Sequence, residues 1–376
     1  MPKKILIVDD SALMRRVLSD IIESDKRFVL TDSANNGLEA YDLIVTSPSK
    51  YDLIILDINM PKMNGIQLME KMNEKNIHIP VLIVSTIAKE GAAETIRCLE
   101  LGAFDFITKP DSFLETKSER FSDTILRLMC GALSMPAATD AARPAAVDVH
   151  AAPTVEHGAS GSGPMSYVKV TGIKRRPHTP VSASARKLVA IACSTGGPKA
   201  LQQVIPKLPA NLNAPVLLVQ HMPEGFTGTL ASRLNEMSAV TVSEALDGEV
   251  IENGHVYIAK GGRHLRLSRK GRDYTVSLGD DEPRNSLRPC ADIMYESLQG
   301  LGFDEIICVV LTGMGSDGTR GIGRLCEKDN TYIIAQDEDS STVYGMPRMV
   351  REAGITDEIV TLGSIADAIA GQVGVC

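Results

Sequence analysis

Short apolar runs alternate with helical patterns along the N-terminal part of the chain. The runs that we predict as strands are Ile5–Val8, Leu53–Leu56, Val81–Val84 and Phe104–Ile107. Between them, Ala12–Ile22 and Gly65–Met72 carry apolar residues every three or four positions, as one face of an amphipathic helix does. Short strands separated by helices indicate βα units wound around a parallel sheet.

The C-terminal half shows the same alternation, with predicted strands at Leu188–Ala192, Val216–Val219, Ile306–Leu311 and Tyr332–Ala335. Between the halves, residues 131–166 are dominated by Ala, Gly and Pro and contain no Phe, Trp or Tyr. Such a segment buries too little apolar surface to offset the entropy lost on ordering. We therefore predict two α/β parallel-sheet domains, residues 1–130 and 187–376, joined by a flexible linker over residues 131–186. A basic cluster in this linker, Lys174–Arg176, is either a solvated charge run or a docking point for an acidic partner.

Composition narrows the class of protein. With 44% hydrophobic and 23% charged residues among 376, the chain has ample material for buried cores. Its net charge of −8 disfavours a protein that binds nucleic acid electrostatically. No apolar run approaches the roughly 20 residues that span a bilayer. The seven cysteines are scattered along the chain without CxxC or metal-ligand spacing, which is typical of reduced thiols in a cytosolic protein. We therefore expect a cytoplasmic protein without membrane insertion.

Polar residues follow the successive strands of the N-terminal domain, namely Asp9 and Asp10, Asp57, Ser85 and finally Lys109. The carboxyl ends of parallel strands form the edge at which such sheets bind ligands. Three carboxylates in one cleft repel each other, and a hard cation such as Mg²⁺ relieves that repulsion. One carboxylate could then accept a phosphoryl group, whose oxygens a hydroxyl and an ammonium group would hold.

The order of these residues resembles the receiver domains of two-component response regulators over residues 1–130. The resemblance rests on Asp9-Asp10, Asp57 with Met60-Pro61 and Asn64-Gly65, Ser85-Thr86, and Lys109-Pro110. It implies a flavodoxin-like fold with Asp57 as the phosphoacceptor. It also implies a Mg²⁺ site and a phosphoryl switch, with metal ligands from Asp9, Asp10, Asp57 and the backbone carbonyl of Asn59, and with Ser85, Phe106 and Lys109 at the switch positions.

A serine lies in a tight turn after the first strand of the C-terminal domain. The segment Cys193-Ser194-Thr195-Gly196-Gly197-Pro198 leads into a predicted helix, and its glycines permit a sharp strand-to-helix turn. The Ser194 hydroxyl would stand above the sheet near the positive end of that helix. Alternatively, Ser194 or Thr195 merely caps the helix. Cys193 is disfavoured as a nucleophile because adjacent strand residues point to opposite faces.

His221 and Asp317 follow two further strands of the same domain. An imidazole activates a serine hydroxyl by taking its proton, and a carboxylate orients the imidazole. The glycine-rich loop around Met314 could present backbone N–H groups to a developing oxyanion. These features predict a Ser-His-Asp triad in a chain order that differs from that of α/β-hydrolases.

Two other histidines are rival bases. His255 precedes the predicted strand Val256–Ala259, and we expect it in a turn. His264 follows Gly261-Gly262-Arg263 and could line the cleft.

At these residues the chain resembles the chemotaxis protein-glutamate methylesterases of the CheB family. The resemblance covers residues 187–376 and rests on Cys193–Pro198, Gln220–Pro223, Leu311–Gly318 and Tyr344–Pro347. It implies a second doubly wound, Rossmann-like domain that hydrolyses γ-glutamyl methyl esters on methyl-accepting chemoreceptors and releases methanol. In many members of the family this domain also deamidates receptor glutamines.

The same resemblance implies the roles of individual residues. Ser194 would be the nucleophile, His221 the general base and then acid, and Asp317 the orienting carboxylate. The Met314 backbone N–H would bind the oxyanion, and Thr195 lies beside the nucleophile. The ester reaction would need no cofactor, and the histidine kinase CheA would be the phosphodonor. Four residues depart from the usual family pattern around the site, namely Ala192, Cys193, Lys260 and Cys290.

Together these features predict a phosphorylation-activated esterase whose unphosphorylated receiver covers the Ser194 cleft. Two alternatives stay open. One is a receiver-controlled adaptor with a vestigial triad, and the other is an acyl hydrolase that acts on a protein outside chemotaxis. A transcription factor is disfavoured because no basic recognition helix follows the linker.

Overall fold

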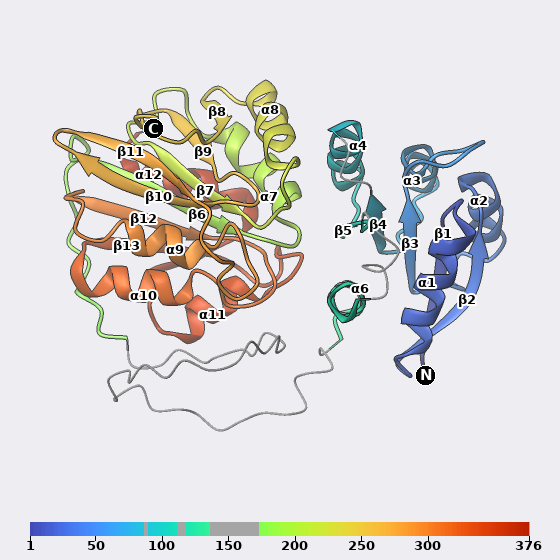
Figure 1. Cartoon of the computed structure of the whole chain (residues 1–376). Coiled ribbons are helices and arrows are strands. Elements are labelled where there is room, and N and C mark those ends of the chain that lie inside the picture. The colour runs from blue at the N-terminus through green and yellow to red at the C-terminus, as the bar shows by residue number, and fades with distance from the viewer. Residues whose placement is uncertain (86–88, 111–117, 136–172, 376) are drawn as a thin grey trace.

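Two α/β domains lie side by side in the computed structural model (Figure 1). The structure describes residues 1–85, 89–110, 118–135 and 173–375. Most of the predicted linker, residues 136–172, lies outside the described residues. Within the described parts, no helix is long and apolar enough to cross a membrane.

The N-terminal domain is built on five parallel strands in the order β2-β1-β3-β4-β5, which is the flavodoxin-like order. The strands are β1 (Lys3–Val8), β2 (Phe28–Ala34), β3 (Leu53–Asp57), β4 (Val81–Ser85) and β5 (Asp105–Thr108). The helices are α1 (Ala12–Glu23), α2 (Gly37–Thr46), α3 (Gly65–Glu74), α4 (Lys89–Glu100) and α6 (Glu119–Ala132).

Helices cover both faces of this sheet. Ile5 and Ile7 of β1 face the core that α1 and α6 cover, whereas Leu6 and Val8 face the core that α2, α3 and α4 cover. Because both faces are buried, the strands read as continuous apolar runs rather than as an alternation of apolar and polar residues.

The C-terminal domain has a seven-stranded parallel sheet in the order β14-β13-β12-β6-β7-β9-β8, with a separate β10–β11 hairpin. Its strands are β6 (Lys187–Cys193), β7 (Val216–Gln220), β8 (Thr241–Glu244), β9 (His255–Ile258), β10 (His264–Lys270), β11 (Asp273–Gly279), β12 (Glu305–Val310), β13 (Thr331–Gln336) and β14 (Glu358–Val360). Its helices are α7 (Gly197–Val204), α8 (Thr227–Met237), α9 (Ala291–Ser297), α10 (Thr319–Lys328), α11 (Met346–Glu352) and α12 (Ile365–Val373), with 3₁₀ turns η2 (Ile205–Lys207) and η3 (Leu362–Ser364).

The prediction of two doubly wound parallel-sheet domains is confirmed. Helices α7, α8 and α12 cover one face of the C-terminal sheet, and α9, α10 and α11 cover the other. The expectation that His255 lies in a turn is wrong. His255 is the first residue of β9, where its ring stacks on Tyr257 at 4.0 Å and its Nε2 lies 2.8 Å from Ser243 Oγ.

The end of the predicted linker packs on the C-terminal domain. Arg175 donates hydrogen bonds to the carbonyls of Ile355 (2.9 Å) and Thr331 (3.1 Å), and Arg176 donates to the carbonyl of Lys328 (2.7 Å). These two guanidinium groups of the basic cluster therefore bond within the chain, while Lys174 and Arg176 remain exposed to solvent.

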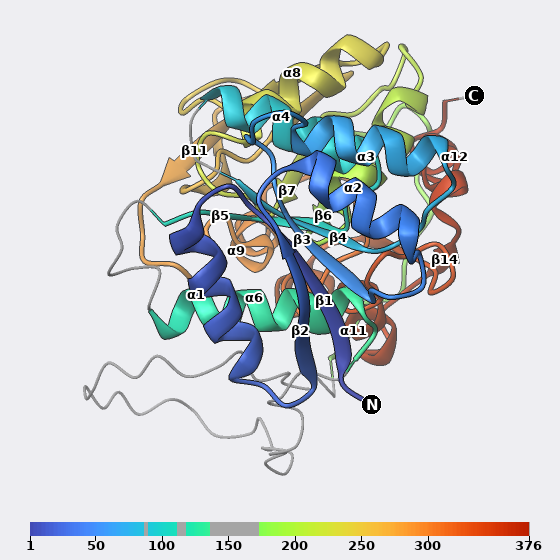
Figure 2. The ribbon, with the colours of Figure 1, turned by 90° about the vertical axis from the view of Figure 1, so that its right-hand side faces the viewer.

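The two domains contact each other through the carboxyl-edge loops of the C-terminal sheet. Helix α4 lies against α7 and α8. Figure 1 shows α4 on the side of the receiver that faces α8, and Figure 2 shows α4 alongside α8. At the other side of this interface α6 ends beside the loop after β12, where Met314 Cε lies 2.7 Å from the position that a Cβ on Gly131 would occupy. The receiver-like domain therefore contacts the loops on which the predicted triad lies.

Candidate active site and receiver site

Three adjacent strands carry the predicted triad. In the order β12-β6-β7, Ser194 follows the middle strand, His221 follows β7, and Asp317 lies in the loop after β12. Backbone hydrogen bonds continue between neighbouring segments at the ends of these strands. They run from Ser194 N–H to the carbonyl of Thr312 (3.0 Å) and from His221 N–H to the carbonyl of Cys193 (3.1 Å). The sheet therefore brings the three residues to one edge.

Ser194 begins a tight turn into α7. The residue that caps the helix is Gly196, at φ 77°, and no side chain makes a capping hydrogen bond there. A residue with φ in this left-handed region is most often glycine. The alternative that Ser194 or Thr195 caps the helix is therefore wrong. Among the hydrogen bonds of the described residues, none joins Ser194 Oγ to the His221 ring, and such bonds often close only when substrate binds.

The base and the carboxylate are already in contact. His221 Nε2 lies 2.7 Å from Asp317 Oδ2, and both side chains are buried. Asp317 also accepts the N–H groups of Ala291 (2.6 Å), Asp292 (3.0 Å) and Gly318 (3.0 Å). Burial by itself would raise the pKa of Asp317, but His221 and these N–H groups outweigh it and lower the pKa to about 2. Asp317 is therefore ionised and fixed in place.

Three carboxylates gather at the carboxyl edge of the N-terminal sheet. Ligand oxygens of Asp9, Asp10 and Asp57 all lie within 4.8 Å of one another. Lys109 Nζ lies 2.9 Å from Asp9 and 2.7 Å from Asp57. Burial raises the pKa of Asp57 to about 6, although the Lys109 charge opposes that shift.

These residues fit a divalent cation. Asp9 Oδ2 is buried in the cluster and pairs with Lys109 Nζ at 2.9 Å, and as a carboxylate oxygen it would also bind a cation. Three carboxylates beside one lysine leave excess negative charge, which Mg²⁺ with its preference for oxygen ligands would neutralise. Asn59 follows in the exposed part of the loop after β3.

The predicted switch residues have different surroundings. Ser85 is buried at the end of β4, with the Thr95 hydroxyl 2.7 Å from its Oγ. Phe106 of β5 packs against Phe226, the residue just before α8, with ring centroids 4.7 Å apart. The predicted switch aromatic residue thus contacts the second domain directly.

Known proteins share both halves of this arrangement. Residues 5–117 match the model of the response regulator receiver domain, and residues 189–369 match that of the CheB methylesterase. A protein-glutamate methylesterase/protein-glutamine glutaminase of Bacillus subtilis is 40% identical, with 97% of each chain covered. One of Halalkalibacterium halodurans is 39% identical, with 98% of each covered. The chain belongs to the CheB methylesterase family.

Solved structures are similar to each half. The CheB methylesterase catalytic domain of Thermotoga maritima is 39% identical and covers 50% of this chain and 98% of its own, with a TM-score of 0.48. The response regulator domain of Thermotoga maritima CheB is 37% identical and covers 36% of this chain and 99% of its own, with a TM-score of 0.32. As a CheB methylesterase, this chain is a hydrolase with a response regulator domain.

Cys193 and His264, the rival nucleophile and the rival base of the methylesterase domain, are both buried. The Cys193 thiol is fully buried and lies 3.0 Å from Gln220 Oε1, and burial strongly raises its pKa. His264 is also fully buried, and its Nε2 lies 3.2 Å from the carbonyl of Glu282. Burial lowers the pKa of His264. Neither the Cys193 thiol nor the His264 ring is hydrogen-bonded to the His221 ring or to the Asp317 carboxylate.

The loops that would bind the oxyanion pack tightly around the nucleophile. A Cβ on Gly313 would lie 2.9 Å from Ser194 Cβ, so the backbone of this loop approaches the nucleophile as closely as glycine allows. Met314 is half-buried, and Thr195 is buried, with its carbonyl accepting the Thr312 hydroxyl at 3.0 Å.

Some polar residues of the site escaped the sequence reasoning. Asp292 is buried in the first turn of α9, and its Oδ1 accepts the N–H groups of Gly318 (2.9 Å) and Gly321 (2.7 Å). The Asp105 carboxylate of the receiver lies beside the Thr195 side chain, which lowers its pKa against the effect of burial. An acid in the first turn of a helix and an acid in a short strand are common on solvated surfaces, so neither stood out.

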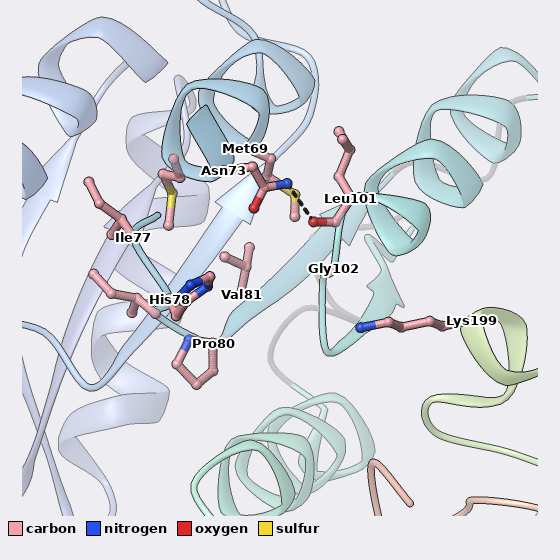
Figure 3. Close-up of a pocket in the computed structure, with 11 residues that line it drawn as sticks. Met69, Asn73, Ile77, His78, Pro80, Val81, Leu101, Gly102 and Lys199 are labelled. Carbon is pink, nitrogen blue, oxygen red and sulfur yellow. Dashed lines mark hydrogen bonds between the residues drawn. The ribbon is translucent and has the colours of Figure 1, made fainter. Parts of the chain in front are cut away.

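A separate hollow lies at the seam between the domains. Its volume is about 380 Å³, and residues such as Met69, His78 and Leu101 of the receiver line it, with Lys199 of α7 pointing toward it (Figure 3). Asn73 donates a hydrogen bond to the Leu101 carbonyl on its wall (2.8 Å). It contains none of the predicted triad or phosphorylation residues.

Proposed function

We propose that this chain hydrolyses γ-glutamyl methyl esters of methyl-accepting chemoreceptors with Ser194, His221 and Asp317, and that phosphorylation of Asp57 activates it. We also propose that it deamidates receptor glutamines. The observation that carries the proposal is the His221–Asp317 contact of 2.7 Å on the strands flanking the one that ends at Ser194. The curated relatives are named for both activities.

In the ester reaction, Ser194 Oγ attacks the carbonyl carbon while the His221 ring nitrogen not bound by Asp317 takes the hydroxyl proton. The Met314 backbone N–H stabilises the oxyanion of the tetrahedral intermediate. His221 then returns the proton to the leaving methoxide, and methanol departs. Water, activated by His221, hydrolyses the acyl-enzyme and regenerates Ser194. With a glutamine substrate the leaving group is ammonia.

In the receiver, Asp57 takes the phosphoryl group from the histidine kinase CheA. Asp9, Asp10 and Asp57, with the Asn59 carbonyl, would hold Mg²⁺, which supplies positive charge to the transferring phosphoryl oxygens. Lys109, already in contact with Asp57, would bind one of those oxygens, and Ser85 would bind another.

Contacts between the domains support inhibition by the unphosphorylated receiver. The Asp105 carboxylate lies beside Thr195, next to the nucleophile, and Gly131 lies against Met314 of the oxyanion loop. Phosphorylation at Asp57 would draw in the switch residues and weaken the contact of Phe106 with Phe226. The population then shifts toward an arrangement in which receptors reach Ser194.

Methanol release from methylated receptor membranes, with and without a small phosphodonor, tests both parts of the proposal. Ser194→Ala should abolish methanol release. Asp57→Ala should leave the unphosphorylated rate unchanged and should remove the stimulation by the phosphodonor. Full activity of Ser194→Ala would overturn the nucleophile assignment. Stimulation that survives in Asp57→Ala would overturn the switch assignment.

The alternatives give other outcomes. A receiver-controlled adaptor would not react with a fluorophosphonate at Ser194, whereas the proposed esterase is labelled there. An acyl hydrolase acting outside chemotaxis would be labelled but would release no methanol from receptor membranes.

A further inference from the structure

The Gln220 side chain lies between the two residues that carry the chemistry. It is the last residue of β7 and is only 2% exposed. We infer that Gln220 is a positioning residue whose amide group holds the Ser194 turn and the His221 backbone at a fixed separation. The inference rests on the roles proposed above for Ser194 and His221.

The amide of Gln220 uses its donors and its acceptor on neighbours of the site. Its Nε2 donates to the carbonyls of Ser194 (3.0 Å) and His221 (2.9 Å), and its Oε1 accepts from the Cys193 thiol (3.0 Å). A primary amide has two N–H donors and one carbonyl. The reversed orientation would set the amide oxygen against two carbonyl oxygens, so the partners determine the orientation.

This bridge begins where the sheet ends. Residues Cys193 and Gln220 are the last pair in register between β6 and β7. One further backbone hydrogen bond, from His221 N–H to the Cys193 carbonyl, joins the ends of β7 and β6 at this edge of the sheet. Beyond it, the backbones of Ser194 and His221 turn away into different loops. The Gln220 amide donates to the carbonyls of both residues, and so links the two segments where backbone hydrogen bonds between the strands have ended.

Gly197 shows how closely the amide is enclosed. A Cβ on Gly197 would lie 1.9 Å from Gln220 Oε1, whereas the next nearest atom outside that side chain, Cys193 Cβ, would be 3.1 Å away. A methyl group at this position would therefore displace the amide while leaving Gln220 itself intact. Gly197→Ala is thus a second, independent way to break the bridge.

The expected consequence is on turnover rather than on substrate binding. Gln220 is buried behind the nucleophile, so its loss leaves the substrate contacts in place but frees the Ser194 turn to move relative to His221. Misplacing reacting groups by about 1 Å can cost roughly 100-fold in rate. We expect kcat to fall by about 10- to 100-fold with KM little changed.

The first experiment measures methanol release by the phosphodonor-treated full-length protein. Gln220→Met removes the amide at similar length, and the loss should fall on kcat and on the rate of fluorophosphonate labelling at Ser194. The matched control is Gln372→Met, which makes the same change in α12. There the amide donates to Glu305 (2.8 Å), at the amino end of β12 and away from the triad. The control should keep wild-type kcat.

A double-mutant cycle gives a readout that a purely structural residue would not. Gly197→Ala should lower kcat in the wild-type background, because the methyl group expels the amide. In the Gln220→Ala background the same change should cost little further, because no amide remains to be expelled. This cycle stands on its own if Gln220→Met folds poorly.

The pH profile of Gln220→Glu adds a third test. A protonated carboxyl can donate one hydrogen bond to one of the two carbonyls, whereas an ionised one can donate none. The kcat of the folded variant, relative to wild type, should therefore fall as pH rises through the pKa of the new carboxyl group.

Failure of the positioning role of Gln220 and failure of the proposed function would give different results. If Gln220→Met and Gly197→Ala keep kcat within twofold of wild type while Ser194 remains essential, the positioning role is wrong and the proposed function stands. Additive losses in the cycle would equally overturn it. If the wild-type protein is not labelled at Ser194, the proposed function itself fails.

Discussion

Asp317 and Asp292 are both buried at the same site, yet the pKa values of their carboxyl groups shift in opposite directions. The pKa of Asp317 is lowered to about 2, because His221 and backbone N–H groups outweigh burial. The pKa of Asp292 is raised to about 6, because burial and the neighbouring Asp317 charge dominate. Asp317 can therefore stabilise a positive His221, while Asp292 holds the loop by accepting the N–H groups of Gly318 and Gly321.

Asp105 should make the inhibition of the unphosphorylated enzyme depend on pH. Burial raises its pKa to about 6, although Thr195 opposes that shift. An acid whose pKa is raised in the closed state stabilises that state below its ordinary pKa, near 3.8, and this contribution is lost as pH rises through about 6. Asp105→Asn stays neutral and keeps an acceptor for Thr195. It should therefore lower the unphosphorylated rate several-fold at neutral pH.

The measurement is the ratio of wild-type to Asp105→Asn methanol release without phosphodonor. We expect this ratio to rise between about pH 4 and 6 and to level off above that, because the closed state loses stability between the ordinary and the raised pKa of the carboxyl group. With saturating phosphodonor the ratio should approach one, since the contact is then open in both proteins. A ratio that does not change with pH would show that this carboxyl does not oppose closure.

Among the secondary-structure elements, the central strands of both sheets could be predicted from the sequence, because a strand buried on both faces is a continuous apolar run. Their ends were harder to place. Gln220 and Gln336 are polar yet buried, and they extend β7 and β13 by one residue each beyond the predicted runs. Each amide also has a partner in the loop after another strand, Ser194 for Gln220 and Thr312 for Gln336, and these partners are far away in sequence.

The candidate site could be predicted only as a set of strand-end residues. The order β12-β6-β7, which puts Ser194 between the other two, depends on how the strands pair and not on their spacing in the chain. The β10–β11 hairpin was not predicted, and neither was the bridging role of Gln220. Contacts between the domains, such as that of Phe106 with Phe226, depend on docking surfaces that the sequence pattern does not encode locally.

One ion pair links α4 of the receiver to α8 of the methylesterase domain. Arg233 Nε lies 2.7 Å from Glu100 Oε1, and Gln202 of α7 donates to the same oxygen at 3.3 Å. The Arg233 side chain is 41% exposed, so the pair is worth about 0.5–1 kcal/mol. Arg233→Glu should therefore raise the unphosphorylated rate by roughly two- to fivefold.

Charge reversal on the other side provides the control for this ion pair. Glu100→Arg together with Arg233→Glu restores opposite charges and should return the unphosphorylated rate toward wild type. The measurement is methanol release without phosphodonor at low and high salt, since screening weakens an exposed pair. If the double variant is as active as Arg233→Glu alone, the pair does not hold the domains together.

At the scale of the whole molecule, the two chemistries are kept in separate domains and meet at one interface. Within the described residues, the one group of three carboxylates suited to a metal is Asp9, Asp10 and Asp57 in the receiver. Ester hydrolysis by the proposed triad relies on proton transfer through His221 and on the N–H groups of the Met314 loop. Metal dependence should therefore belong to regulation and not to turnover.

Removing divalent cations tests this division. In a chelator, the unphosphorylated wild-type protein should release methanol at its usual rate, but a small phosphodonor should no longer stimulate it. Adding back Mg²⁺ should restore the stimulation in the wild type and not in Asp57→Ala, whose rate should stay constant throughout. If chelation instead lowered the unphosphorylated rate of both proteins, a metal would be needed at the ester site itself. Because Mg²⁺ is attracted by the combined negative charge of the three carboxylates, Asp10→Asn should weaken Mg²⁺ affinity while leaving the unphosphorylated rate unchanged.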